Sequence, residues 1–284
     1  MILKQLRTHI LSSLSKNYSQ EEANSFFYML TKHYLKLNKI DVPLNFDKII
    51  IEKEQFQFSQ AVDRLLVNEP IQYIIGETEF YGLPFKVNLN TLIPRPETEE
   101  LVDWIVSDLK NNTSEKKILD IGTGSGCIII ALAKTIHNGK FAGVDVSAEA
   151  LKIAQTNADI NKAEVEFIEV NILKQTGNLN GNFDIIVSNP PYVRDLEKTK
   201  MLPNVLDNEP HLALFVPDND PLLFYRKISQ FAKKSLNLGG SLYFEINEYL
   251  GGEMIQLLEN EGFLNIELKQ DFFGKDRMIK AMKL

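Results

Sequence analysis

The spacing of hydrophobic residues divides the chain into a helical part and a part where strands and helices alternate. Up to about residue 69, apolar side chains recur every three or four positions, as Leu3, Leu6 and Ile10 do, which is the spacing of one helix face. From Lys117 onward, short apolar runs typical of buried strands alternate with helical patterns. Repeated strand–helix units predict an α/β fold, with a mostly parallel sheet and helices on both faces.

The predicted strands of this second part are short and regularly spaced. They cover residues 117–121, 141–145, 165–170, 183–188, 240–246, 263–268 and 277–282. Helices are predicted between them, and residues 194–220, which are polar and rich in proline, are expected to form a long loop.

Residues 70–95 carry strand and turn signals instead of a helical pattern. Apolar and polar residues alternate at 73–80 and 85–89 around a turn at 81–84, which predicts a β-hairpin. A new helix is expected at Pro96, because proline suits the first helical position. We therefore predict a helical domain at 1–69, a β-hairpin linker at 70–95 and an α/β domain at 96–284.

Composition and charge narrow the class of protein. The 284 residues are 44% hydrophobic and 24% charged, which is ordinary for a globular protein. The formal net charge of −7 argues against a broad surface that grips nucleic-acid phosphates. We expect no direct nucleic-acid partner and a monomer.

Cysteine and histidine usage bears on compartment and metals. Cys127 is the only cysteine, so no intramolecular disulfide can form and a reducing compartment is expected. The four histidines are scattered, so no metal site is predicted. No run is long enough to span a membrane, and charges interrupt the apolar residues near the N-terminus, so we expect a cytoplasmic protein without a membrane partner.

A strand followed by Asn189-Pro-Pro-Tyr192 is the first candidate site. The prolines end the strand, so Asn189 and Tyr192 are held at its carboxyl end, where open parallel sheets bind ligands. Asn189 offers an amide, Pro190 and Pro191 offer carbonyls without N–H groups, and Tyr192 offers a flat ring. These groups suit a planar NH2 group. The plain alternative is a turn, because Asn-Pro often begins one.

A glycine loop forms the second candidate site. Gly122, Gly124 and Gly126 follow a predicted strand and precede a helix, and Asp145 ends the next strand about 20 residues later, where a carboxylate can accept from ribose hydroxyls. The spacing Gly-x-Gly-x-Gly differs from the Gly-x-Gly-x-x-Gly of dinucleotide sites. Loop and acid together indicate a cofactor that carries a nucleoside.

With these motifs, the chain resembles class I S-adenosylmethionine-dependent methyltransferases that act on a planar nitrogen. Residues 70–87 and 92–99 narrow the resemblance to the HemK/PrmC family of bacterial release factor glutamine methyltransferases. The similarity runs from about Pro70 to the C-terminus, after a helical domain in the same place. It implies a Rossmann-like, mostly parallel seven-stranded sheet whose last strand is antiparallel.

The resemblance also implies an activity. The enzyme would transfer a methyl group from S-adenosylmethionine to the N5 nitrogen of glutamine in the Gly-Gly-Gln motif of release factors, leaving S-adenosylhomocysteine. The helical domain would help to hold that protein substrate. Asn189, Pro190 and Tyr192 would be catalytic, and with Pro191 they would bind the substrate. The implied cofactor contacts are Gly122, Thr123, Gly124, Ser125, Gly126, Asp145, Val146, Asn171, Ile172 and Asn189; Asn171 stands where the family usually has an acid.

Three rival functions can be weighed against the same motifs. A nucleic-acid adenine N6-methyltransferase would hold an adenine amino group at Asn189 and stack the flipped base on Tyr192. Its discriminating feature, a basic target-recognition segment, is not evident in this acidic chain. A non-catalytic nucleotide sensor would leave Asn189-Pro-Pro-Tyr192 unexplained, and a dehydrogenase fits the glycine spacing poorly.

Overall fold

The computed structural model describes residues 1–110, 112–174, 179 and 181–284. Two compact units make up the chain. The first is Met1–Gly76 together with Leu202–Asn208, and the second is Glu77–Met201 together with Glu209–Leu284. The predicted three-part division gave no indication that residues 202–208 belong with the N-terminal helices. They join that unit partly through Asn208, whose Nδ2 donates to the carbonyl of Asn68 at 3.1 Å.

The first unit is helical, as the hydrophobic spacing predicts. Its elements are α1 (Leu3–Leu14), α2 (Gln20–Leu35), η1 (Pro43–Asn45), α3 (Glu52–Leu66), α4 (Ile71–Ile75) and α8 (Pro203–Leu206). Helix α2 begins at a capping box, in which Ser19 Oγ accepts from the Glu22 N–H and Glu22 reaches back to the Ser19 N–H. The core of the unit is built from one face of each long helix, with Leu6, Phe27 and Phe58 buried.

The hairpin is present, but its first strand is shorter than the predicted 73–80, and its second strand occupies 83–86 instead of the predicted 85–89. Residues 71–75 form α4, and Gly76 ends it with a left-handed φ of +72°. β1 (Glu77–Phe80) then pairs with antiparallel β2 (Leu83–Lys86). The prediction of strand at 73–75 was wrong. Isoleucine and tyrosine favour strands by propensity, but here burial of Ile71, Tyr73 and Ile74 decides the conformation.

The second unit is organised by a seven-stranded sheet. Its strands are β3 (Lys116–Ile121), β4 (Gly139–Asp145), β5 (Glu166–Glu169), β6 (Phe183–Ser188), β9 (Leu236–Glu245), β10 (Leu264–Gln270) and β11 (Asp276–Met282). The order is β10-β11-β9-β6-β3-β4-β5. β11 runs antiparallel to both neighbours, whereas β5, β4, β3, β6 and β9 pair in parallel. The predicted class I methyltransferase sheet, with an antiparallel last strand, is confirmed.

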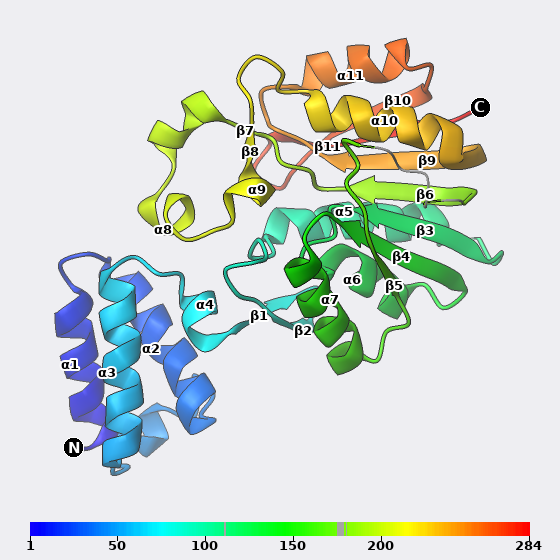
Figure 1. The fold of residues 1–284 in the computed structure, drawn as a ribbon. Helices are drawn as coiled ribbons and strands as arrows, with labels where there is room; N and C mark the ends of the chain where they lie inside the picture. The colour runs from blue at the N-terminus through cyan, green and yellow to red at the C-terminus, as the bar shows by residue number, and fades with distance from the viewer. Residues whose placement is uncertain (111, 175–178, 180) are drawn as a thin grey trace. The chain divides into compact units, whose positions relative to one another are not determined.

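Helices cover both faces of this sheet (Figure 1). α5 (Pro96–Leu109), α6 (Cys127–Thr135) and α7 (Ala148–Asn161) lie on one face, and α10 (Leu223–Ser235) and α11 (Gly251–Asn260) lie on the other. Successive residues of a strand serve the two cores in turn: Leu242 and Phe244 of β9 pack with α10 and α11, whereas Tyr243 packs toward α5. The central strands β3, β6 and β9 are therefore buried on both sides toward their carboxyl ends, which explains their apolar runs.

The segment predicted as one long loop, residues 194–220, contains short elements. These are β7 (Val193–Arg194), η2 (Asp195–Lys200), α8, α9 (His211–Leu214) and β8 (Phe215–Val216). β7 pairs in parallel with β8, which ties the two ends of the segment together. Elements of two to six residues are too short to leave a hydrophobic period, so the sequence did not predict them.

Candidate active site

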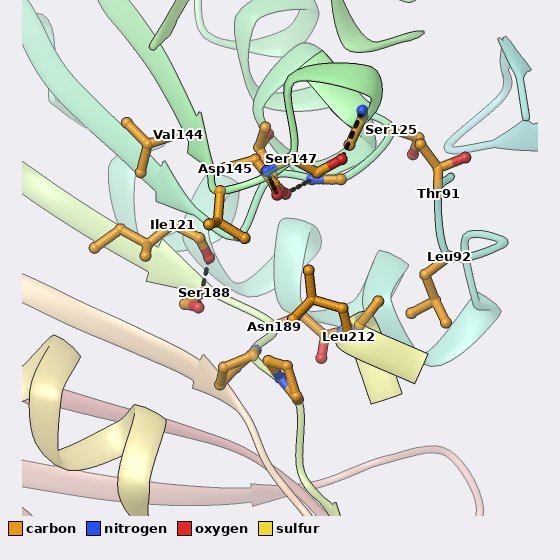
Figure 2. A pocket seen from close by; sticks show the side chains of 18 of the residues that line it. Thr91, Leu92, Ile121, Ser125, Val144, Asp145, Ser147, Ser188, Asn189 and Leu212 are labelled. Carbon is orange, nitrogen blue, oxygen red and sulfur yellow. Dashed lines mark hydrogen bonds between the residues drawn. The ribbon is translucent and has the colours of Figure 1, made fainter. Parts of the chain in front are cut away.

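A cavity of about 390 Å³ lies at the carboxyl ends of β3, β4, β5 and β6. The chain leaves the central strand β3 for β4 and β5 on one side of it, and then crosses to β6 on the other side, so the direction in which strands are added reverses at β3. Such a switch point leaves a crevice in which open α/β sheets bind ligands. The volume is in the range of small-molecule sites. The predicted glycine loop, Asp145 and Asn189 all line this one cavity, and Figure 2 shows the labelled Asp145, Asn189 and Leu212 around it.

The loop after β3 brings its backbone to the cavity wall. Gly122 and Gly124 have φ values of +74° and +55°, and a Cβ at either position would meet no atom within 4 Å. The space beside them is open, so a ligand can approach the backbone closely. Thr123 and Ser125 also line the cavity.

Gly126 differs from the other two glycines of the motif. It does not line the cavity; a Cβ there would stand 2.9 Å from Ile130 Cδ1 and 3.2 Å from Ala154 Cβ. Its φ is +80°, at the start of α6. The missing side chain thus lets α6 pack against α7, and the predicted contact between Gly126 and a cofactor gains no support from this geometry.

Asp145 is held in place by two backbone groups. Its Oδ2 accepts from the Gly124 N–H at 2.9 Å and its Oδ1 accepts from the Ser147 N–H at 3.0 Å. Burial raises the pKa of this carboxyl, and the backbone hydrogen bonds oppose the rise. Each oxygen keeps a lone pair, so the carboxylate can still accept from a diol.

A second acid, Asp120, supports the loop from below. It is fully buried at the end of β3 and accepts from Thr123 Oγ1 at 2.7 Å. Burial raises its pKa to about 7. Asp120 does not line the cavity, so it acts on the shape of the loop and not directly on a ligand.

The segments that follow β4 and β5 add further lining residues. The residues predicted there, Val146, Asn171 and Ile172, all line the cavity. Asn171 Oδ1 accepts from the Leu173 N–H at 3.0 Å, which fixes the turn after β5. Apolar lining comes also from the α10 side of the sheet, from Ile121, Val144, Val170, Phe224 and Ile228.

Three residues of Asn189-Pro-Pro-Tyr192 line the cavity, and the fourth does not. Asn189, Pro190 and Pro191 face it, whereas the Tyr192 ring packs against the core on the α10 side of the sheet. The Tyr192 hydroxyl donates to Glu245 Oε1 at 3.0 Å, and burial raises its pKa. Stacking of a substrate on Tyr192 stays a prediction.

Two residues that the sequence analysis did not select join this site. Glu245 ends β9 with 2% of its surface exposed, and its Oε2 accepts from Thr98 Oγ1 at 2.6 Å. Thr98 lines the cavity and in turn accepts from Asn189 Nδ2 at 3.4 Å. The available signal was an acid at the end of an apolar strand, at the same sheet edge as Asn189.

An ion pair lies beside the cavity, and its arginine, Arg95, is a lining residue. Arg95 Nη2 lies 2.6 Å from Glu209 Oε1, and Glu209 is 4% exposed. The Ile93 N–H also donates to Glu209 Oε2, at 3.3 Å. The pair joins the segment before α5 to the segment before α9, and both segments contribute lining residues, among them Pro94 and Pro210.

Neither a metal-ligand cluster nor a membrane-spanning helix occurs among the residues that the structure describes. Within residues 1–110, 112–174, 179 and 181–284, no three histidine, cysteine or acidic side chains lie together as metal ligands would. None of the helices in those ranges has the length and apolar character that a membrane crossing requires.

Comparisons with protein families agree with this geometry. Residues 101–211 match the family model of the methyltransferase small domain, and residues 5–76 match that of the PrmC N-terminal domain. Among relatives, the release factor glutamine methyltransferase of Flavobacterium psychrophilum is 52% identical over 99% of each chain. That of Bacteroides thetaiotaomicron is 43% identical over 98% of this chain and 99% of its own.

A solved structure supports the fold. The methyltransferase from Pyrococcus furiosus matches with a TM-score of 0.52 and 22% identity, over 79% of this chain and 98% of its own. At this identity the likeness concerns the arrangement of strands and helices alone.

Proposed function

Because the chain belongs to the release factor glutamine methyltransferase family, we propose that it methylates the side-chain nitrogen of a glutamine in peptide chain release factors, with S-adenosylmethionine as the methyl donor. The glutamine is that of the Gly-Gly-Gln motif. The observation that carries the proposal is that Asn189 and Pro190 line the same cavity as the glycine loop and Asp145. The motif proposed to bind an amide and the motif proposed to bind a nucleoside thus share one cavity.

The cavity fits S-adenosylmethionine by volume and by chemistry. Asp145 has acceptor capacity for a ribose diol, and the open backbone at Gly122 and Gly124 leaves room for a ligand beside the loop. Val146 and Ile172 offer apolar surface for a flat base. When bound, S-adenosylmethionine would supply an electrophilic methyl group on a positively charged sulfur.

Asn189 and Pro190 would orient the substrate nitrogen. An amide nitrogen is a weak nucleophile, because its lone pair is delocalised into the carbonyl. If Asn189 Oδ1 and the Pro190 carbonyl each accept one N–H of the glutamine, the nitrogen is fixed and slightly enriched in electron density. Positioning of this kind supplies up to roughly 7–11 kcal/mol in favourable systems.

The surroundings of the site favour transfer of a cationic methyl group. The positive charge spreads from sulfur toward the amide as the methyl group moves and is lost when the N–H proton then leaves to water. Apolar walls such as Ile121 and Val144 favour this dispersal of charge by excluding water from the sulfur. Burial raises the pKa of the Cys127 thiol to about 12, so this lining residue stays protonated and does not act as a base. A strong base is not required, since the nitrogen becomes acidic once it is methylated.

Labelled methyl transfer tests the proposal. The enzyme is offered a release factor, the same factor with Gln→Ala in its Gly-Gly-Gln motif, and duplex and single-stranded DNA. Label on the unchanged release factor alone is expected. Label on DNA and none on protein would contradict the proposed substrate and would favour the adenine N6-methyltransferase.

A further inference from the structure

A chain of hydrogen bonds runs from Asn189 to a buried carboxylate. Asn189 Nδ2 lies 3.4 Å from Thr98 Oγ1, and Thr98 Oγ1 lies 2.6 Å from Glu245 Oε2. The other oxygen of Glu245 accepts from the Tyr192 hydroxyl at 3.0 Å. The groups come from α5, the end of β9 and both ends of the Asn189-Pro-Pro-Tyr192 segment. Only Thr98 and Asn189 of the four line the cavity.

When Glu245 is ionised, only one arrangement of donors and acceptors is possible along this series of hydrogen bonds. A carboxylate only accepts, so Thr98 donates its single proton to Glu245. The Thr98 oxygen can then only accept from Asn189, which therefore presents its NH2 group to Thr98. The two ends of a side-chain amide are interchangeable in shape, so such a partner decides which way the group is turned. Asn189 Oδ1 is left for another donor.

We propose that Glu245 and Thr98 are positioning residues, which hold the Asn189 amide in the flip that presents Oδ1 to the NH2 group of the substrate. The inference rests on the proposed function, because only a substrate that donates needs Oδ1. With the amide reversed, Asn189 would turn an N–H toward the N–H groups of the glutamine. Two donors would then face each other, and the substrate nitrogen would lose one of its two fixed partners.

Strand β9 and helix α5 also share a second hydrogen-bonded pair, which has no connection to Asn189 and can serve as a control. The Tyr243 hydroxyl donates to Asp108 Oδ2 at 2.6 Å, which joins β9 to α5 as Thr98 and Glu245 do. Neither residue lines the cavity or hydrogen-bonds Asn189. If the Thr98–Glu245 contact only held α5 on the sheet, breaking either pair would have similar consequences for turnover.

Protonation of Glu245 would allow the direction of donation along these hydrogen bonds to reverse. A protonated carboxyl donates, so Thr98 would be free to donate to Asn189 and to stabilise the wrong flip. Burial raises the pKa of Glu245, while its hydrogen bonds from Thr98 and Tyr192 oppose the rise. Glu245 interacts electrostatically with five other charged or titratable groups, each from a different segment. These are Arg277, Glu97, Tyr192, Tyr225 and Cys127. Turnover should therefore fall in acid, at a pH above the ordinary carboxyl range.

The test compares four variants of the full-length enzyme with wild type, on one release factor. Thr98→Val keeps the shape and removes both hydrogen bonds, and Thr98→Ser keeps both. Glu245→Gln removes the titration, and Tyr243→Phe is the matched control. Turnover at saturating S-adenosylmethionine is followed against pH, and the affinity for S-adenosylmethionine is measured separately by calorimetry.

We expect Thr98→Val to lose roughly tenfold or more in kcat, equivalent to 1.4 kcal/mol, with S-adenosylmethionine affinity within about threefold of wild type. Thr98→Ser should recover most of this loss, and Tyr243→Phe should stay within about twofold. The fall in turnover at acid pH (the acid limb of the pH profile) that we expect of wild type should be absent from Glu245→Gln.

Two results would overturn the inference while leaving the proposed function intact: Thr98→Val turning over at the wild-type rate, or Glu245→Gln keeping the acid limb. Failure of the wild-type enzyme itself to label the release factor would instead overturn the proposed function, and with it the inference.

Discussion

The three glycines of the loop after β3 should respond to alanine in two different ways. At Gly122 the new Cβ stands in open space and only the left-handed backbone is strained, which costs about 1–2 kcal/mol of folding stability. At Gly126 the same strain applies, and the Cβ also meets Ala154 Cβ at 3.2 Å and Ala154 Cα at 3.4 Å. Ile130 Cδ1, at 2.9 Å, is a side-chain end that can move. Overpacking adds about 1–3 kcal/mol, so Gly126→Ala should cost about 2–5 kcal/mol in total.

Ligand binding should follow the opposite order. A methyl group at Gly122 occupies the space beside the cavity, so S-adenosylmethionine should bind at least about tenfold more weakly to Gly122→Ala. Gly126→Ala should bind it within a few-fold of wild type under conditions in which it is folded. Urea unfolding gives the first quantity and titration calorimetry gives the second. Gly126→Ala as stable as Gly122→Ala, or weaker binding in Gly126→Ala alone, would refute the assignment of Gly126 to helix packing.

Further changes test other parts of the site. Asp145→Asn should weaken S-adenosylmethionine binding roughly 10- to 100-fold in calorimetry, because a charged acceptor is worth about 1.5–3 kcal/mol; unchanged affinity would remove Asp145 from the ligand contacts. Arg95→Met should lower the urea midpoint more than Glu209→Gln does, since it leaves a buried charge without its partner, at about 3–5 kcal/mol; the reverse order would contradict this. Because burial raises the pKa of Asp120 in the folded protein to about 7, above the usual carboxyl range, its contribution to stability is full below about pH 4 and is lost progressively as pH rises to about 7. Wild type should therefore lose more stability between about pH 5 and pH 7 than Asp120→Asn, and parallel pH curves for the two proteins would argue against this pKa.

The sequence predicted the parts of the fold that carry their own local signal. The strand 183–188 was predicted at the observed bounds, because an apolar run meets two prolines that cannot continue a sheet ladder. Serine before a helical run is a typical local signal of a helix start, and Ser147 caps α7, where its Oγ accepts from the Ala150 N–H at 3.2 Å. The family resemblance supplied the antiparallel direction of the last strand, which local pattern alone does not contain.

Features that depend on distant partners were harder to predict. Residues 73–75 were predicted as the start of a strand, yet they are helical because their burial is decided by the helices around them. Thr98 and Glu245 are 147 residues apart, so no motif spacing connects them. Gly126 looked equivalent to Gly122 in the motif, and only the neighbouring α7 separates their roles.

The most direct test of the central claim is to locate the methyl group on the substrate. A release factor is incubated with S-adenosylmethionine and enzyme, digested, and its Gly-Gly-Gln peptide is sequenced by mass spectrometry, with Asn189→Ala run beside wild type. We predict one methyl group on the glutamine side chain with wild type, and at least about 100-fold slower transfer with Asn189→Ala. A methyl group on another residue, or near-normal transfer by Asn189→Ala, would contradict the account.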